Sequence, residues 1–107
     1  MSISEIIETV HEGGAEVEVC ATAEAQYDPP EQKISVALDS FARRLFASGD
    51  GQHRPQGWLP APEHVTEHLS RNEASTFAKD VFQSWVRKVR AAIPPELRST
   101  TSHLHSL

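Results

Sequence analysis

The chain has 107 residues, of which 38% are hydrophobic and 23% are charged, and its net charge is −5. This length suits one domain and excludes a multidomain enzyme. Apolar runs never exceed three residues, so we expect no membrane-spanning helix and no secretory leader. A single cysteine, Cys20, cannot form an intrachain disulfide. We therefore expect a cytoplasmic protein.

The charges divide along the chain. Residues 32–107 carry seven acidic and ten basic side chains, a net charge of +3. Every charged side chain in residues 1–31 is acidic, namely Glu5, Glu8, Glu12, Glu16, Glu18, Glu24, Asp28 and Glu31. The two parts should attract each other, and the acidic part could instead face a basic partner.

The first segment has a helical spacing of apolar residues. Ile3, Ile6, Ile7 and Val10 stand at positions i, i+3, i+4 and i+7, and Gly13-Gly14 follows. The spacing predicts a short helix that ends near Glu12.

The next segment alternates. From Ala15 to Tyr27 the odd positions are apolar and the even positions are mainly polar. This period of two predicts a strand from Ala15 to about Thr22. The high alanine and glutamate content leaves a helix over Ala15 to Gln26 as the alternative.

A second helix is predicted from Asp28, a possible N-cap before Pro29, to Ser48-Gly49. Its apolar stripe consists of Ile34, Ala37, Leu38, Phe41, Ala42 and Leu45. The stretch from Gly49 to Pro62 contains three glycines and three prolines and is predicted to be a long loop.

The last helix begins at the capping pattern Ser70-Arg71-Asn72-Glu73 and ends before Pro94-Pro95. Its apolar stripe includes Trp85 and Val89. Before it, His64 to Leu69 is predicted to be a second strand, with one helical turn as the alternative.

These elements predict an α+β fold, in which three helices pack on a small antiparallel sheet in the order helix, strand, helix, loop, strand, helix. The alternative is an all-α bundle. Residues 1–95 would form a single compact domain and residues 96–107 a C-terminal tail. Two strands are marginal alone, so we expect a homodimer that pairs the open edge of the first strand.

The candidate binding residues lie in the long loop. Trp58 falls outside any apolar stripe, with Arg54 and His53 nearby. Tryptophan and arginine are enriched at binding hot spots, so these three residues are the predicted partner-binding site. Alternatively, Trp58 folds back over the core.

A metal site is the main alternative chemistry. His64, Glu67 and His68 match the pattern H-x-x-E-H, in which two histidines one helical turn apart bind zinc. On a strand, the same histidines are about 13 Å apart and cannot share a metal. With a strand predicted here, we assign no metal, no cofactor and no catalytic residues.

A basic cluster closes the last helix. Arg87, Lys88 and Arg90 accompany Trp85 and could bind nucleic acid, although cations also stabilise a helix C-terminus. The net acidity disfavours nucleic acid. The sequence thus predicts a small non-catalytic interaction or regulatory protein with a protein partner and no membrane contact. The second hypothesis is a small metal-dependent enzyme, and the third is a nucleic-acid-binding protein.

Overall fold

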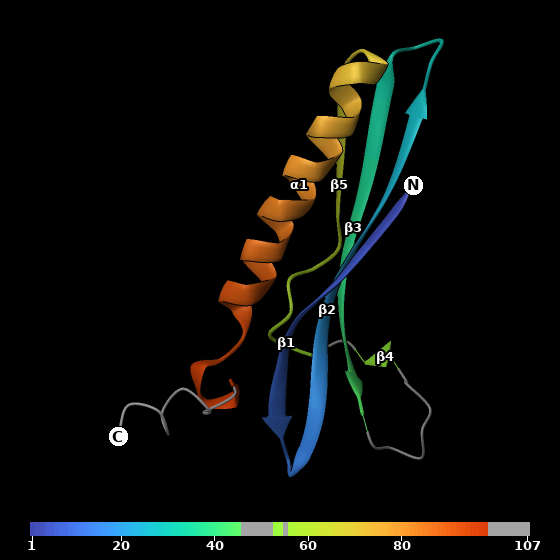
Figure 1. The fold of residues 1–107 in the computed structure, drawn as a ribbon. Coiled ribbons are helices and arrows are strands. Elements are labelled where there is room, and N and C mark those ends of the chain that lie inside the picture. The colour runs from blue at the N-terminus through green and yellow to red at the C-terminus, as the bar shows by residue number, and fades with distance from the viewer. Residues whose placement is uncertain (46–52, 55, 99–107) are drawn as a thin grey trace.

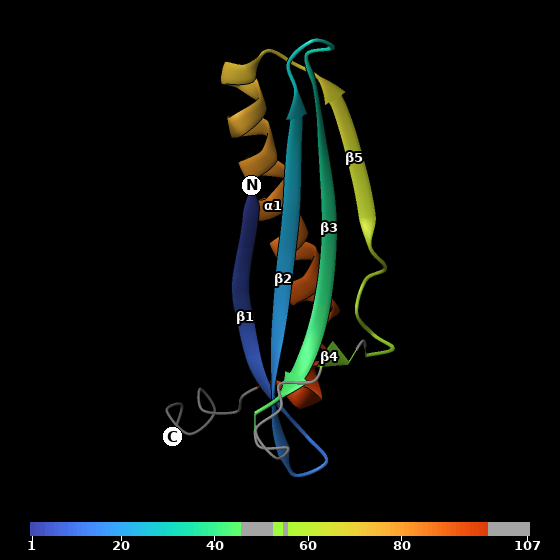
Figure 2. The same ribbon diagram turned by 90° about the vertical axis from the view of Figure 1, so that its right-hand side faces the viewer.

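The fold is an antiparallel sheet with one long helix. The structure, a computed structural model, describes residues 1–45, 53–54 and 56–98, with only the backbone at 53 and 54. The elements are β1 (Ser2–Glu12), β2 (Ala15–Asp28), β3 (Lys33–Arg44), β4 (His53–Arg54), β5 (Glu63–His68), α1 (Arg71–Ala92) and the short 3₁₀ turn η1 (Pro95–Leu97). The strand order is β1-β2-β3, and both β4 and β5 pair with β3. Figures 1 and 2 show α1 lying along one side of this sheet.

The predicted arrangement of three helices on a small sheet is therefore wrong, and so is the all-α alternative. Two of the three expected helices are strands in the structure, β1 and β3. The strand that begins at Ala15 and the helix that follows Ser70 are both present. The stretch from Ala15 is the central strand, paired on both sides, so it has no open edge.

The first predicted helix is wrong, since residues 2–12 form the strand β1. An irregularity in this strand produces the helix-like spacing of its apolar residues. The β1–β2 register shifts between Ile6 and Glu8, which makes Ile7 an extra residue, as in a β-bulge. Ile7 and Val10 are buried as a result, whereas Ile6 is 54% exposed. The two glycines form the hairpin turn. Gly13 and Gly14 have φ of +57° and +79°, as the central positions of a type I′ turn require.

The second predicted helix is also wrong, since residues 33–44 form the strand β3. This strand carries apolar residues on both of its faces. Ile34, Val36, Leu38 and Ala42 alternate and are buried, while Ala37 and Phe41 belong to the opposite face. The two sets together resemble a helical stripe. The prolines before this segment lie in the β2–β3 turn, where Gln32 donates a backbone hydrogen bond to the Pro29 carbonyl at 3.2 Å.

The hydrophobic core lies between α1 and one face of the sheet. The buried face of α1 is formed by Ala74, Ala78, Phe82, Trp85, Val86 and Val89. It packs against the odd positions of β2 and the even positions of β3 in a single cluster. Alanines at positions 21, 23 and 25 of β2 let the helix approach the sheet closely.

The end of the described chain returns to the sheet. Ile93 is 1% exposed, and Leu97 packs partly against the core. Arg98 then forms an isolated antiparallel bridge with Val10 of β1, and its guanidinium donates to the Arg90 carbonyl at 2.8 Å. The helices in the described part of the chain include none long and apolar enough to cross a membrane.

Candidate functional site: the helix-free face of the sheet

The face of the sheet opposite α1 is covered by no helix among the described residues (Figure 1). We call it the helix-free face. Residues that pair directly across antiparallel strands share a face, so the register assigns its members. They include Ser2, Ser4, Ile6, Thr9, Glu16, Glu18, Cys20, Thr22, Glu24, Gln26, Lys33, Ser35, Ala37, Asp39, Phe41, Arg43, His64, Thr66 and His68.

An apolar row crosses this polar face. Ile6 is directly opposite Cys20, which is directly opposite Phe41. Cys20 is only 4% exposed although no helix covers it, because its two neighbours in the row flank it. Ile6 is one of the two large hydrophobic side chains that are exposed within the described ranges. The row is thus an apolar strip that reaches solvent at β1.

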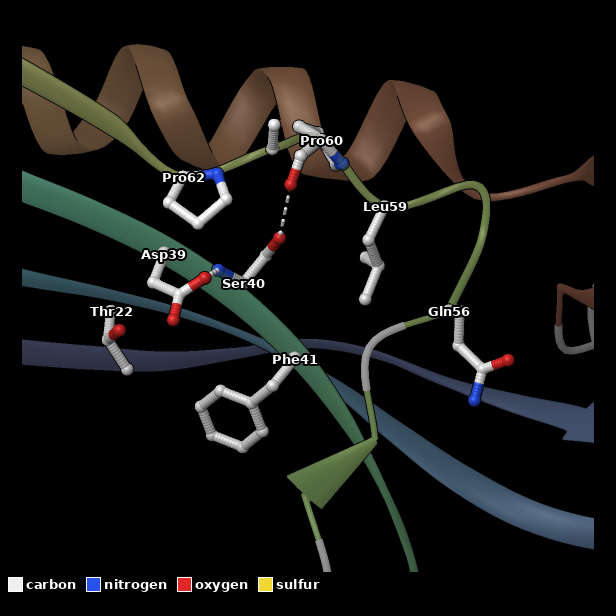
Figure 3. A pocket seen from close by; sticks show the side chains of 9 residues that line it. Thr22, Asp39, Ser40, Phe41, Gln56, Leu59, Pro60 and Pro62 are labelled. Carbon is white, nitrogen blue, oxygen red and sulfur yellow. Dashed lines mark hydrogen bonds between the residues drawn. The ribbon is translucent and has the colours of Figure 1, made fainter.

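A hollow of about 610 Å³ opens beside the row. β3 pairs with β5 up to Leu38 and with β4 from Ala42, so residues 39–41 lie in a gap along that edge. Figure 3 shows Thr22, Asp39 and Phe41 on one wall and Leu59, Pro60 and Pro62 on the other. Ser40 holds the two walls together, since its hydroxyl donates to the Pro60 carbonyl at 3.2 Å.

A second hollow, of about 470 Å³, continues along the same face. It shares Thr22, Asp39 and Pro62 with the first. Ser4 and Ala37 are among the residues that line it, and their side chains are too small to fill it. The two hollows therefore form one depression across the middle of the helix-free face.

An ion pair borders the row on its other side. The Arg43 guanidinium lies 2.7 Å from Glu18 Oε1, and its Nε donates to the same oxygen at 2.8 Å. This contact joins the acidic N-terminal part to the basic remainder of the chain, as the charge division predicted.

The Cys20 thiol is poorly suited to nucleophilic chemistry. Burial raises its pKa, and the Glu18 carboxylate raises it further, while Arg43 lowers it. Because the thiolate is the reactive form, the raised pKa keeps Cys20 in its unreactive, protonated state.

The predicted binding residues of the loop are only partly described. Trp58 is half-buried and packs against the core cluster, and its neighbour Leu59 lines the first hollow. The backbones of His53 and Arg54 pair with Arg43 and Ala42, but their side chains lie outside the described part of the structure. A role of these three residues in partner binding stays a prediction.

The metal motif lies on an extended strand. His64 and His68 belong to β5 and occupy the helix-free face, whereas Glu67 pairs with Ile34 and faces the other way. Two histidines four residues apart on a strand are separated by about 13 Å, too far to share one metal ion. The described residues hold no cluster of three or more side chains able to bind a metal.

The basic cluster of α1 has no exposed aromatic side chain from Trp85 beside it. Trp85 is 2% exposed, so its ring is not accessible for stacking on a base. Lys88 lies over that ring, 5.6 Å from its centroid, and its ammonium group pairs with Glu63. Arg87 and Arg90 are exposed, and Arg90, in the last turn, stabilises the C-terminus of the helix.

Sequence reasoning missed the apolar row and the adjoining depression. Both Ile6 and Phe41 were assigned to buried helical stripes, which removed them from consideration as surface residues. A usable signal was present, because residues 33–44 also alternate with a period of two.

No family model, no curated protein and no solved structure matches this chain.

Proposed function

We propose that the protein is a small non-catalytic interaction protein that forms a homodimer through its helix-free face. The observation that supports this proposal is the apolar row on an otherwise polar sheet face, with Ile6 of the edge strand β1 54% exposed. Apolar side chains grouped on a surface are typical of interaction sites. His53, Arg54 and Trp58, on the loop side of the same sheet, would contribute to binding a further protein partner.

A second copy is the occupant that the charges favour. On the β1–β2 half of the helix-free face every charged side chain is acidic, with Glu16, Glu18 and Glu24. The β3 half carries Lys33 and Arg43 together with Asp39. A two-fold axis parallel to the strands would place the acidic half of one copy over the basic half of the other.

Such a dimer would stack two sheets face to face, at a spacing of about 10 Å. The apolar rows would meet near the axis, and the shallow depression beside Phe41 would receive side chains of the other copy. This arrangement would cover a face of long strands that α1 leaves open. The edge of the sheet would take no part in it.

Light scattering tests the proposal. At micromolar concentration the protein should have about twice the mass of one chain. Ile6→Glu should yield a folded monomer, because it places a charge in the apolar row, between the stacked faces. Gln26→Glu is the matched control: it adds the same charge on the same face, about 20 Å along β2 from the row, and should remain dimeric. A folded wild-type monomer at this concentration would refute the proposal.

A further inference from the structure

We propose that the outer edge of β1, from Ser2 to Ile6, binds an extended peptide of a partner protein as an added strand. The peptide carries apolar side chains at alternate positions and lysine or arginine between them. This inference concerns the edge of the sheet and does not depend on the proposed dimer, which uses the face of the sheet.

The edge of β1 presents outward backbone groups. Met1 and Ala25 exchange two backbone hydrogen bonds, of 2.8 and 2.9 Å, across β1 and β2. Hydrogen-bonded pairs alternate along an antiparallel ladder, so Ile3 and Glu5 also direct their backbone groups toward β2. Those of the residues between them, such as Ser4, point outward. Such a row of N–H and C=O groups is a template for a further strand.

One contact limits the available stretch. Within the described ranges, the outer edge of β1 pairs with Arg98 alone, at an isolated bridge opposite Val10. That bridge lies at the far end of the strand from Ser2. An added strand therefore has room over the first half of β1.

A hollow of about 400 Å³ lies beside this half, between β1 and α1. Ile3 and Phe82 supply apolar lining, while Glu5 and Lys79 bring one charge of each sign. Because side chains of a strand alternate between faces, every second side chain of the added strand would point to this side. With the two charges balanced, the hollow favours an uncharged, apolar side chain that covers Ile3.

The charges near the edge favour a cationic partner. β1 contains Glu5, Glu8 and Glu12 and neither lysine nor arginine. On the helix-free face, Ser2 lies opposite Glu24, whose carboxylate accepts a hydrogen bond from the Ser2 hydroxyl. An added strand would lie about 10 Å from β2. Lysine or arginine on its helix-free side would extend across Ser2 toward Glu24.

A second copy of β1 suits this edge less well. Self-pairing would bring the glutamates of two copies together, and like charges on paired strands are destabilising. The favoured occupant is therefore a different chain of opposite charge. Strand addition of this kind combines main-chain hydrogen bonds with pockets for alternate side chains, and the edge of β1 supplies both.

A short synthetic peptide that alternates valine and lysine tests the proposal on the full chain. With saturating peptide, the outward amides of Ser4 and Ile6 should exchange with solvent at least about tenfold more slowly by NMR. The inward amides of Ile3 and Glu5 should keep the protection that they have without it. A peptide of the same length that alternates valine and glutamate should bind at least about tenfold more weakly.

Two variants of one residue separate the backbone from the side chain. Ser4→Pro should weaken binding of the valine–lysine peptide at least about tenfold, because the ring removes an outward N–H. An edge strand tolerates proline where that group faces solvent, so the variant should fold. Ser4→Ala is the matched control: it also removes the hydroxyl but keeps the N–H, and it should bind as the wild type.

Three results would overturn the inference. The first is no binding of the valine–lysine peptide to the wild type, and the second is equal binding of the valine–glutamate peptide. Both need only the wild-type chain. The third is slow exchange of Ser4 and Ile6 in the protein without peptide, which would show that the edge is already paired. The mass measured for Ile6→Glu tests the dimer separately, so the two proposals fail independently.

Discussion

Trp85 of α1 and Asp39 of β3 are joined by a hydrogen bond, in which the indole Nε1 donates to the Asp39 carbonyl at 2.9 Å. The accepting carbonyl lies in the stretch of β3 between the parts that pair with β4 and β5. Asp39 is also paired with Thr22 of β2, so the bond attaches the helix to the middle of the sheet. The same contact places α1 behind the depression of the helix-free face.

Trp85→Ala should lower the free energy of unfolding by about 3–5 kcal/mol, as removal of a large buried aromatic does. Trp85→Phe should lose less, about 1–2 kcal/mol, because an aromatic ring remains while the hydrogen bond from the indole to the Asp39 carbonyl is lost. Trp58→Ala should cost about 1–2 kcal/mol, since that side chain is only half-buried. Urea midpoints provide all three values. Equal, large losses for the two alanine variants would exclude a binding role for Trp58 that is separate from the core.

Gly14→Ala should destabilise the β1–β2 hairpin by about 1–2 kcal/mol. The cost comes from the backbone, because φ is +79° while nothing lies within 4 Å of an added Cβ. Gly13→Asn should be tolerated, since asparagine adopts the left-handed region more readily. Gly57→Ala serves as the control: its Cβ would also meet open space, without a positive φ. A Gly14→Ala variant as stable as the control would contradict the assigned turn.

Removing both imidazoles, by His64→Ala and His68→Ala together, should change the Tm by less than about 3 °C. Both side chains are exposed on β5, and the strand holds them too far apart for one metal. Elemental analysis of the purified wild type should find no stoichiometric zinc or iron. One equivalent of metal that disappears in the double variant would revive the metal-dependent enzyme.

The buried thiol predicts a loss of stability in alkali. Burial raises the pKa of Cys20 in the folded protein, so the unfolded thiol ionises first, from about pH 8.5. This contribution to stability is complete below the unfolded pKa and is lost as the pH rises through the folded pKa. Cys20→Ala should therefore show a smaller decrease in urea midpoint between pH 7 and pH 10, under reducing conditions. The same decrease in both proteins would contradict a raised pKa.

A variant of Glu18 tests a second cause of the raised Cys20 pKa. Its carboxylate is the second cause of the raised Cys20 pKa, after burial. Glu18→Gln should therefore lower the pKa only in part, and alkylation of Cys20 at a fixed pH should be faster than in the wild type.

The sequence was sufficient to predict α1 because several local signals agree there. The apolar stripe has one period, and the helix begins directly after Ser70, where the capping pattern places its start, although the Ser70 hydroxyl donates to the Glu73 carboxylate at 2.7 Å and makes no cap bond to the backbone. β2 was predictable in part, since the alternation of apolar and polar residues indicated a strand from Ala15 to about Thr22, whereas the strand continues to Asp28. The strand predicted from His64 to Leu69 is also present, as β5.

The other two strands could not be recognised from their spacing alone. In β1 a single extra residue shifts the alternation, and in β3 the partly buried apolar residues Ala37 and Phe41, on the face opposite α1, complete a false helical stripe. Only pairing with β2, a contact between distant residues, decides which face each side chain occupies. The helix-free face was missed for the same reason, because it exists only once β1 and β3 are recognised as strands.

The extra residue in β1 also determines where this strand can change in length. Without Ile7, Ile6 and Glu8 would follow each other opposite Cys20 and Val19, and every remaining side chain of β1 would keep its present face. The loss would be confined to one buried aliphatic side chain. A deletion inside β2 has a larger effect, because it would turn the side chains on one side of the deleted residue to the opposite face of the sheet. This strand pairs with neighbours on both sides, so both pairings would be affected. Single-residue deletions should therefore be tolerated at Ile7 and rejected throughout β2.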